Sequence, residues 1–137
     1  MIVVDTNVLS EFMRPQPDQQ VVRWLESAEQ SSLALTPISV MEITYGVARL
    51  PAGQRKDATR SRWEGIQAAW TGTFLPLGIV ESVAAGEVLG ARAAIGRSIT
   101  TPDAQLAGIC LAWGAALATR NTRDFDGLGI DIINPWE

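Results

Sequence analysis

The stretch MIVVDTNVLS at residues 1–10 decides the fold. Its apolar, β-branched start at residues 2–4 predicts a strand that is buried on both faces of a parallel sheet. Asp5 follows at the carboxyl end of this strand, the edge at which open α/β sheets bind their ligands. Thr6 and Asn7 are good N-cap residues, so we expect a helix to begin directly after the strand. Capping that helix is the alternative role for Asp5.

Length and composition limit the class of protein. With 137 residues, 47% of them hydrophobic, the chain can build one core, and we expect a single domain over residues 1–137. No apolar run reaches the ~18 residues that span a bilayer, and no secretory signal is evident, so we expect a cytoplasmic protein with no membrane partner. Histidine is absent, which excludes Ser-His and Cys-His catalysis and every imidazole metal site. The chemistry must therefore use carboxylates, hydroxyls or a hard metal bound by oxygen.

The charged residues and the single cysteine give further limits. The net charge of −4 argues against non-specific coating of nucleic acid but permits a local basic face. One group of cations lies close together in the sequence: Arg49, Arg55, Lys56, Arg60 and Arg62. The planar fork of arginine suits phosphate or an acidic partner, although a solvated helix face would have the same composition. Cys110 has apolar neighbours, and we expect it to be a buried structural thiol.

Apolar spacing and cap signals predict alternating strands and helices. Helices are expected after Asp18, from Thr36-Pro37 towards residue 50, over 51–72, over 79–95 and from Thr101-Pro102. Within the helix over 79–95, Gly86 and Gly90 are spaced for close helix packing. Strands are expected at 33–35, 74–77, 116–118 and 130–133, with the proline at position 76 favouring a sheet edge. This alternation favours a parallel sheet.

Four acids lie at the ends of predicted elements or on apolar helices. Asp5 and Asp124 follow the first and fourth strands, Asp103 lies in the first turn of a helix, and Glu42 follows Ile38 by one helical turn. If the first and fourth strands are neighbours, these carboxylates converge at one edge of the sheet. Two unit charges ~4 Å apart repel by about 4 kcal/mol at an effective dielectric near 20, so the group favours a bound Mg²⁺ or Mn²⁺. Such a site can activate a water to hydrolyse a phosphodiester.

Two of these acids also have purely structural alternatives. Glu42 can pair with Arg49 along its helix or simply be exposed. Asp103 can serve only to complement the dipole at its helix N-terminus.

Seven segments resemble a known family. MIVVDTNVLS at 1–10, ISVMEI at 38–43 and TPDAQLA at 101–107 resemble the PIN-domain ribonucleases. RPQP at 14–17, LPAG at 50–53, ATRN at 118–121 and NPW at 134–136 are similar to the FitB-like branch of the VapC toxins. The resemblance therefore runs from one end of the chain to the other.

The resemblance implies both a fold and an activity. The implied fold is a three-layer α/β/α domain with a mainly parallel central sheet of four to five strands. The implied activity is that of a Mg²⁺- or Mn²⁺-dependent endoribonuclease, the toxin of a toxin–antitoxin pair. It further implies a homodimer that is neutralised by a small VapB- or FitA-like antitoxin and that forms a higher assembly with it on operator DNA.

Site residues can be carried over from the family by position. Asp5, Glu42 and Asp103 match the metal-binding acids, and Asp124 is the further catalytic candidate. The family's fourth acid often follows the Thr-Arg pair, where this chain has Asn121, which could orient a water or bind through its carbonyl. Thr6 and Asn7 are expected to orient Asp5 or waters around the metal.

Three other functions stay open on the sequence. A degenerate PIN domain would bind RNA or a protein partner without cleaving RNA, which the missing fourth acid permits. A receiver-type phospho-acceptor domain also uses strand-end acids and Mg²⁺, but it needs a lysine after its last strand region, and the only lysine here is Lys56. A DNA-specific nuclease is the third, because no residue in the sequence can be assigned to reading the sugar 2′-OH.

Overall fold

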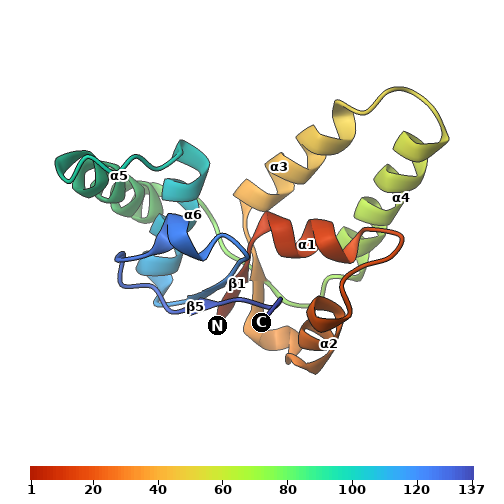
Figure 1. Cartoon of the computed structure of the whole chain (residues 1–137), viewed down its shortest axis with the longest axis horizontal. Coiled ribbons are helices and arrows are strands. Elements are labelled where there is room, and N and C mark those ends of the chain that lie inside the picture. The colour runs from red at the N-terminus through yellow and green to blue at the C-terminus, as the bar shows by residue number, and fades with distance from the viewer.

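The computed structural model describes residues 1–137 as alternating strands and helices (Figure 1). The strands are β1 (Ile2–Val4), β2 (Leu33–Leu35), β3 (Thr73–Phe74), β4 (Ala116–Ala118) and β5 (Ile132–Ile133). The helices are α1 (Thr6–Phe12), α2 (Gln19–Ser27), α3 (Pro37–Ala48), α4 (Gln54–Ala69), α5 (Ile79–Ala94) and α6 (Thr101–Trp113). Two short 3₁₀ turns, η1 (Gln30–Ser32) and η2 (Thr122–Phe125), complete the chain.

The five strands form one parallel sheet in the order β3-β2-β1-β4-β5. β1 lies at the centre, where Ile2 pairs with Leu33 on one side and with Ala116 on the other. The predicted parallel sheet is therefore confirmed, and so is the adjacency of the first and fourth strands. β3 is an edge strand, as Pro76 predicts, but it spans Thr73–Phe74 and ends before the proline, instead of spanning 74–77.

Helices cover both faces of the sheet and give three layers. Figure 1 shows α5 and α6 on one side of the strands and α1 to α4 on the other. Successive residues of β1 serve the two layers, because Val3 belongs to the core under α5 and α6 and Val4 to the core under α1 to α4. This alternation explains why an uninterrupted apolar run forms the central strand. No helix combines the length and the hydropathy needed to cross a bilayer.

Asp18 caps α2 and Thr36 caps α3, as the sequence predicts, but α4 begins at Gln54 rather than at residue 51, and the caps of α1 and α6 differ from the expected residues. Asp5, rather than Thr6 or Asn7, caps α1, and its carboxylate accepts a hydrogen bond from the Thr6 N–H. α6 begins at Thr101, but its cap is Thr100. In both cases the cap is the residue with extended backbone angles directly before the helix. Residues after it are already helical and cannot be the cap, even where their side chains are good cap formers.

The prediction that Gly86 and Gly90 serve close helix packing is wrong. A Cβ at either position would meet nothing within 4 Å, because both lie on the exposed side of α5. The close approach is made by Gly108 of α6, where a Cβ would lie 2.6 Å from the Glu81 carbonyl oxygen on α5. α6 is the inner helix of this layer, and only there does a missing side chain let two backbones meet.

The single thiol behaves as the sequence predicts. Cys110 is free, buried on α6 and part of the core. Burial raises the pKa of the Cys110 thiol to about 12, which keeps it protonated and unreactive as a nucleophile.

Candidate active site

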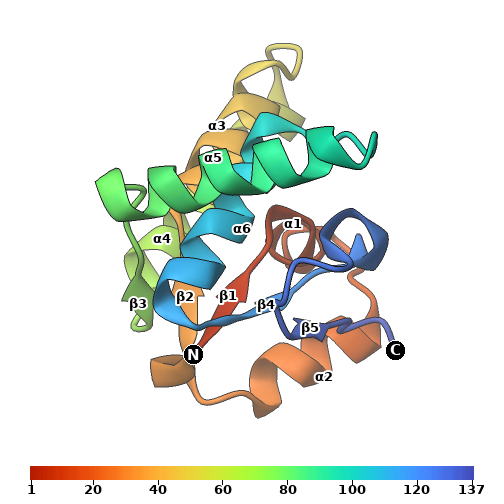
Figure 2. The same ribbon diagram turned by 90° about the vertical axis from the view of Figure 1, so that its left-hand side faces the viewer.

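Four elements bring the predicted acids to one edge of the sheet. Asp5 ends β1, and Asp124 lies in η2, which follows β4. Glu42 lies on α3, directly after β2, and Asp103 lies in the first turn of α6. Figure 2 shows β1 running into α1 beside β4. Because parallel neighbours end at the same edge, acids that are far apart in sequence become neighbours in space.

Asp5 is fixed by hydrogen bonds to both of its carboxylate oxygens. Oδ1 accepts from the Thr6 N–H at 2.7 Å. Oδ2 accepts from the Thr119 hydroxyl at 2.7 Å and from the Asn7 amide Nδ2 at 3.3 Å. Only 5% of Asp5 is exposed, so this carboxylate has little freedom to turn. Asn7 therefore contacts Asp5 through its side chain, whereas Thr6 contacts Asp5 only through its backbone N–H.

Thr6 connects Asp5 to Glu42. Its hydroxyl donates to Glu42 Oε1 at 2.9 Å and lies 3.3 Å from the Ser39 hydroxyl. Ser39 is buried and donates to the Val4 carbonyl at 3.4 Å, which ties α3 to the end of β1. The alternative ion pair of Glu42 with Arg49 does not form, since the only ion pair in the chain joins Arg14 and Glu11.

The other two acids are more open to solvent. Asp103 is partly buried, and its backbone N–H donates to the Thr100 hydroxyl at 3.3 Å. Asp124 is exposed, and it lines the same cavity as Asp103, with a volume of ≈220 Å³. Asn121 is also exposed, and its backbone N–H donates to Thr119 at 3.0 Å. Its side chain makes no hydrogen bond to these acids.

The electrostatics show that the acids act on one another. Burial is the main cause that raises the pKa of Asp5 to about 6, and the charges of Asp103 and Glu42 raise it further. The hydrogen bonds from Thr119 and Thr6 oppose this rise. The pKa of Asp103 is also raised, first by burial and then by Asp124 and Glu42. No basic side chain forms an ion pair with any of these carboxylates.

The donor chemistry suits a hard divalent cation. All candidate ligands are oxygens, and a cation would offset the mutual repulsion that raises the pKa of Asp5 and of Asp103. No three acidic or cysteine side chains are close enough to ligate one ion directly. A cation at these acids would therefore be bound in part through its waters, several of which Mg²⁺ keeps in protein sites. Asp5, Glu42 and Asp103 stay the predicted ligands.

The structure adds a residue that the sequence analysis did not single out. Arg92 of α5 is only 3% exposed, and its guanidinium donates to the backbone carbonyls of Asp124 at 3.0 Å and Asp126 at 2.9 Å. Arg92 thereby holds η2 against α5 and fixes the backbone that carries Asp124. A signal was present in the sequence, because Arg92 shares a helical face with the buried Ala85 and Val88.

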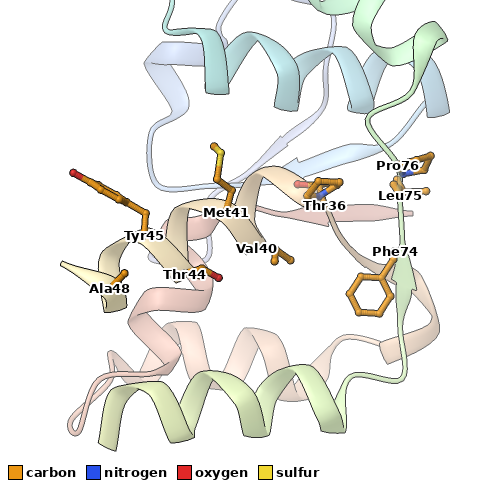
Figure 3. Close-up of a pocket in the computed structure, with 10 residues that line it drawn as sticks. Thr36, Val40, Met41, Thr44, Tyr45, Ala48, Phe74, Leu75 and Pro76 are labelled. Carbon is orange, nitrogen blue, oxygen red and sulfur yellow. The ribbon is translucent and has the colours of Figure 1, made fainter. Parts of the chain in front are cut away.

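The largest hollow lies away from the acids. It has a volume of ≈800 Å³, and its lining is mainly apolar and includes none of the four acids. Figure 3 shows it between α3 and the segment from β3 towards α5. Met41, Tyr45 and Phe74 stand exposed around it. Apolar exposure of this kind is typical of a protein-binding surface rather than of a reaction site.

Comparison with known proteins identifies the class to which this fold and this site belong. The family model of the PIN domain matches residues 2–130, and the chain belongs to the PIN-domain family.

Its relatives include a VapC ribonuclease and a FitB toxin. Over 138 aligned residues the chain is 37% identical to VapC ribonuclease Y4jK of Sinorhizobium fredii, covering 100% of this chain and 99% of that protein. It is 33% identical to toxin FitB of Neisseria gonorrhoeae, covering 99% of each. A solved structure of FitAB bound to a DNA fragment matches with a TM-score of 0.90 at 31% identity, covering 100% of this chain and 96% of that one.

Proposed function

We propose that this chain is the toxin of a toxin–antitoxin pair and acts as a Mg²⁺- or Mn²⁺-dependent endoribonuclease. The observation that carries the proposal is the buried carboxylate of Asp5. Its pKa is raised by burial and by the charges of Asp103 and Glu42, and no basic side chain forms an ion pair with it. A protein bears such a cost at a place where a cation or a reaction uses the charge. The similarity to a VapC ribonuclease supports RNA as the substrate.

The side chains of the site have two roles: some would bind the cation, and others orient the Asp5 carboxylate. Asp5, Glu42 and Asp103 would hold the cation. When bound, the cation would lower the pKa of a water and offset the negative charge that develops on the phosphodiester. Thr6, Asn7 and Thr119 fix the direction of the Asp5 carboxylate through the hydrogen bonds at 2.7–3.3 Å.

Asp124 has a different part in this proposal. It is exposed in the cavity that it shares with Asp103, so its carboxylate is free to accept a proton from an attacking water. Arg92 keeps Asp124 at this cavity by binding its backbone carbonyl. Asn121 occupies the position at which the family often has a fourth acid. In this chain Asp124 would have the role of that acid.

A protein partner is part of the proposal. The similar solved structure contains FitA together with FitB on DNA, and we infer a VapB- or FitA-like antitoxin for this chain as well. The exposed apolar side chains of Met41, Tyr45 and Phe74 support a protein-covered surface, whether in a homodimer or in the assembly with the antitoxin.

The test is cleavage of single-stranded RNA by the purified chain, freed of antitoxin, with Mg²⁺ or Mn²⁺ and with a chelator. Cleavage is expected with either metal and is expected to stop with chelator, in Asp5→Asn and in Asp103→Asn. Asp18→Asn is the matched control, because Asp18 caps α2 away from the site and asparagine is an equally good cap. Metal-stimulated cleavage that persists in Asp103→Asn contradicts the proposal.

One observation favours a second function. Because no three acids meet closely enough to ligate one ion directly, the chain could bind RNA or a protein without cleaving RNA. RNA that binds to the wild-type chain and stays intact at any concentration of Mg²⁺ or Mn²⁺ identifies this degenerate PIN domain.

A further inference from the structure

A groove extends from Glu42 of the acid site between α1, α3 and α4. It has a volume of ≈380 Å³, and Glu42 is one of its lining residues. Figure 1 shows α3 and α4 leading away from the sheet side by side, with α1 near their base, and the contacts between α1 and α3 and between α3 and α4 agree. The groove is therefore continuous with the acids through Glu42.

Three arginines line this groove in a chain whose net charge is −4. Arg55 and Arg62 are seven residues apart on α4 and share one face of that helix. Arg14 follows α1 on the neighbouring wall. Glu42 is the only acid in the lining, so a short positive channel adjoins the negative site.

These arginines keep donors free for a ligand. Arg62 uses Nη1 to donate to the Met13 carbonyl at 3.2 Å, and Arg14 uses Nη1 for its pair with Glu11 at 3.2 Å. A guanidinium has five N–H donors, so each of them retains others. Arg55 lies in the first turn of α4, where the helix dipole adds positive potential.

We propose that this groove binds the sugar-phosphate backbone of the RNA strand next to the phosphodiester at the acids. This inference rests on the proposed function. α4 runs back along α3, because Lys56 donates to the Ala48 carbonyl and Trp63 donates to the Thr44 hydroxyl, so Arg62 lies closer to the Glu42 end of α3 than Arg55 does. The two arginines are about 10 Å apart along the helix at a rise of 1.5 Å per residue. That separation allows the two arginines to contact different phosphates of one strand.

A phosphate chain fits this arrangement better than an acidic peptide does. The groove leads into the acids, and a polyanion that must place one phosphodiester there meets repulsion unless cations neutralise the adjacent phosphates. The planar fork of arginine matches phosphate oxygens in pairs. An acidic peptide has no comparable reason to continue towards four carboxylates.

The test measures RNA binding without cleavage, by fluorescence anisotropy of a labelled single-stranded RNA with the Asp5→Asn chain. Arg55→Gln added to this chain is expected to weaken binding about 3- to 10-fold and to reduce the slope of log K against log salt by about 0.7. Arg60→Gln is the matched control, because Arg60 lies on the same helix, is exposed and does not line the groove. It is expected to leave RNA binding unchanged.

A second variant removes space instead of charge. Gly46 lines the groove, and a Cβ there would meet nothing within 4 Å, so Gly46→Leu is compatible with the fold and fills the groove. It is expected to weaken RNA binding at least as much as Arg55→Gln does. Circular dichroism of both variants checks that they are folded.

The outcomes separate this inference from the proposed function. Unchanged RNA binding in both Arg55→Gln and Gly46→Leu, in a protein whose wild type cleaves RNA, overturns the groove alone. A wild type that fails to cleave RNA refutes the proposed function, whatever the groove binds. Binding of a poly-glutamate peptide is measured with the same variants. If Arg55→Gln and Gly46→Leu weaken binding of this peptide but not of RNA, the groove binds an acidic peptide and the inference is overturned.

Discussion

The two halves of the acid site are built differently. In one half, Thr6 connects the two acids, because its backbone N–H donates to Asp5 and its hydroxyl donates to Glu42, and Asp5 is only 5% exposed. In the other half, Asp103 and Asp124 line an open cavity, and Arg92 holds the backbone beside Asp124 rather than its carboxylate. One half therefore has its carboxylates fixed, and the other leaves them free to turn.

This difference indicates a division of labour. Fixed carboxylates cost no reorganisation at the moment of reaction, which suits the binding of a cation. Asp103 is partly buried and is proposed as the third ligand of the cation, whereas the exposed carboxylate of Asp124 suits proton exchange with water. The four predictions that follow break or sharpen this comparison, from the largest expected free-energy effect to the smallest.

Asp5→Asn should have the largest effect. Loss of the fixed charge is expected to lower RNA cleavage by about 10³-fold, or about 4 kcal/mol. Asparagine is also a good N-cap, so α1 should persist. Cleavage rates and circular dichroism of the variant and of Asp18→Asn measure both effects, and a rate within a few-fold of wild type contradicts the assignment of Asp5 to the fixed half.

The raised pKa of Asp5 should make stability depend on pH. Its pKa is about 6 in the folded chain against an ordinary value of 3.8, so between these values the folded chain binds more protons than the unfolded chain. The free energy of unfolding should therefore fall as pH rises through this window, by at most about 3 kcal/mol from Asp5. Urea unfolding of wild type and Asp5→Asn without divalent metal measures it. A difference between the two chains that does not change with pH disproves the raised pKa.

Arg92→Gln tests the half of the site that contains Asp124, whose backbone carbonyl Arg92 binds. It removes two hydrogen bonds from a buried guanidinium and should cost about 2 kcal/mol of stability. Release of η2 should lower kcat with little change in KM, because Asp124 is positioned for reaction and not for binding. Arg92→Lys should restore only part of both, since an ammonium lacks the planar fork. Arg23→Gln is the control, because Arg23 is exposed on α2. Equal losses of kcat in Arg92→Gln and Arg23→Gln would show that Arg92 does not position Asp124.

Thr119→Val should have the smallest effect. The Thr119 hydroxyl donates to Asp5 at 2.7 Å and holds the pKa of Asp5 down. Its loss should move the acidic limb of the rate profile to higher pH by about one unit, which is about 1.4 kcal/mol. Thr119→Ser keeps the donor and should leave the limb in place. A limb that does not move in Thr119→Val shows that this contact does not tune Asp5.

Much of the fold could be predicted because strong local signals coincided. The apolar run at residues 2–4 predicts a central strand, and Thr36-Pro37 predicts a helix start. The structure has both. The position of the acids followed once β1 and β4 were neighbours. On the sequence, capping of the helix and a role in the acid site are alternatives for Asp5. The structure has both, because the cap uses the Oδ1 atom and leaves Oδ2 for Thr119.

The rest depended on contacts that no local pattern contains. Arg92 binds carbonyls 32 and 34 residues away, and Thr119 binds Asp5 across 114 residues. The choice of Gly108 over Gly86 and Gly90 depends on how α5 and α6 are rotated against each other. Periodicity predicts that a helix forms, but not which of its faces meets a given neighbour.

The most direct test of the central claim is anomalous diffraction from crystals soaked in Mn²⁺. The account predicts one strong manganese peak among the carboxylates of Asp5, Glu42 and Asp103, which is absent from crystals of Asp5→Asn. A manganese peak elsewhere, or none in crystals of a chain that cleaves RNA with Mn²⁺ in solution, contradicts it.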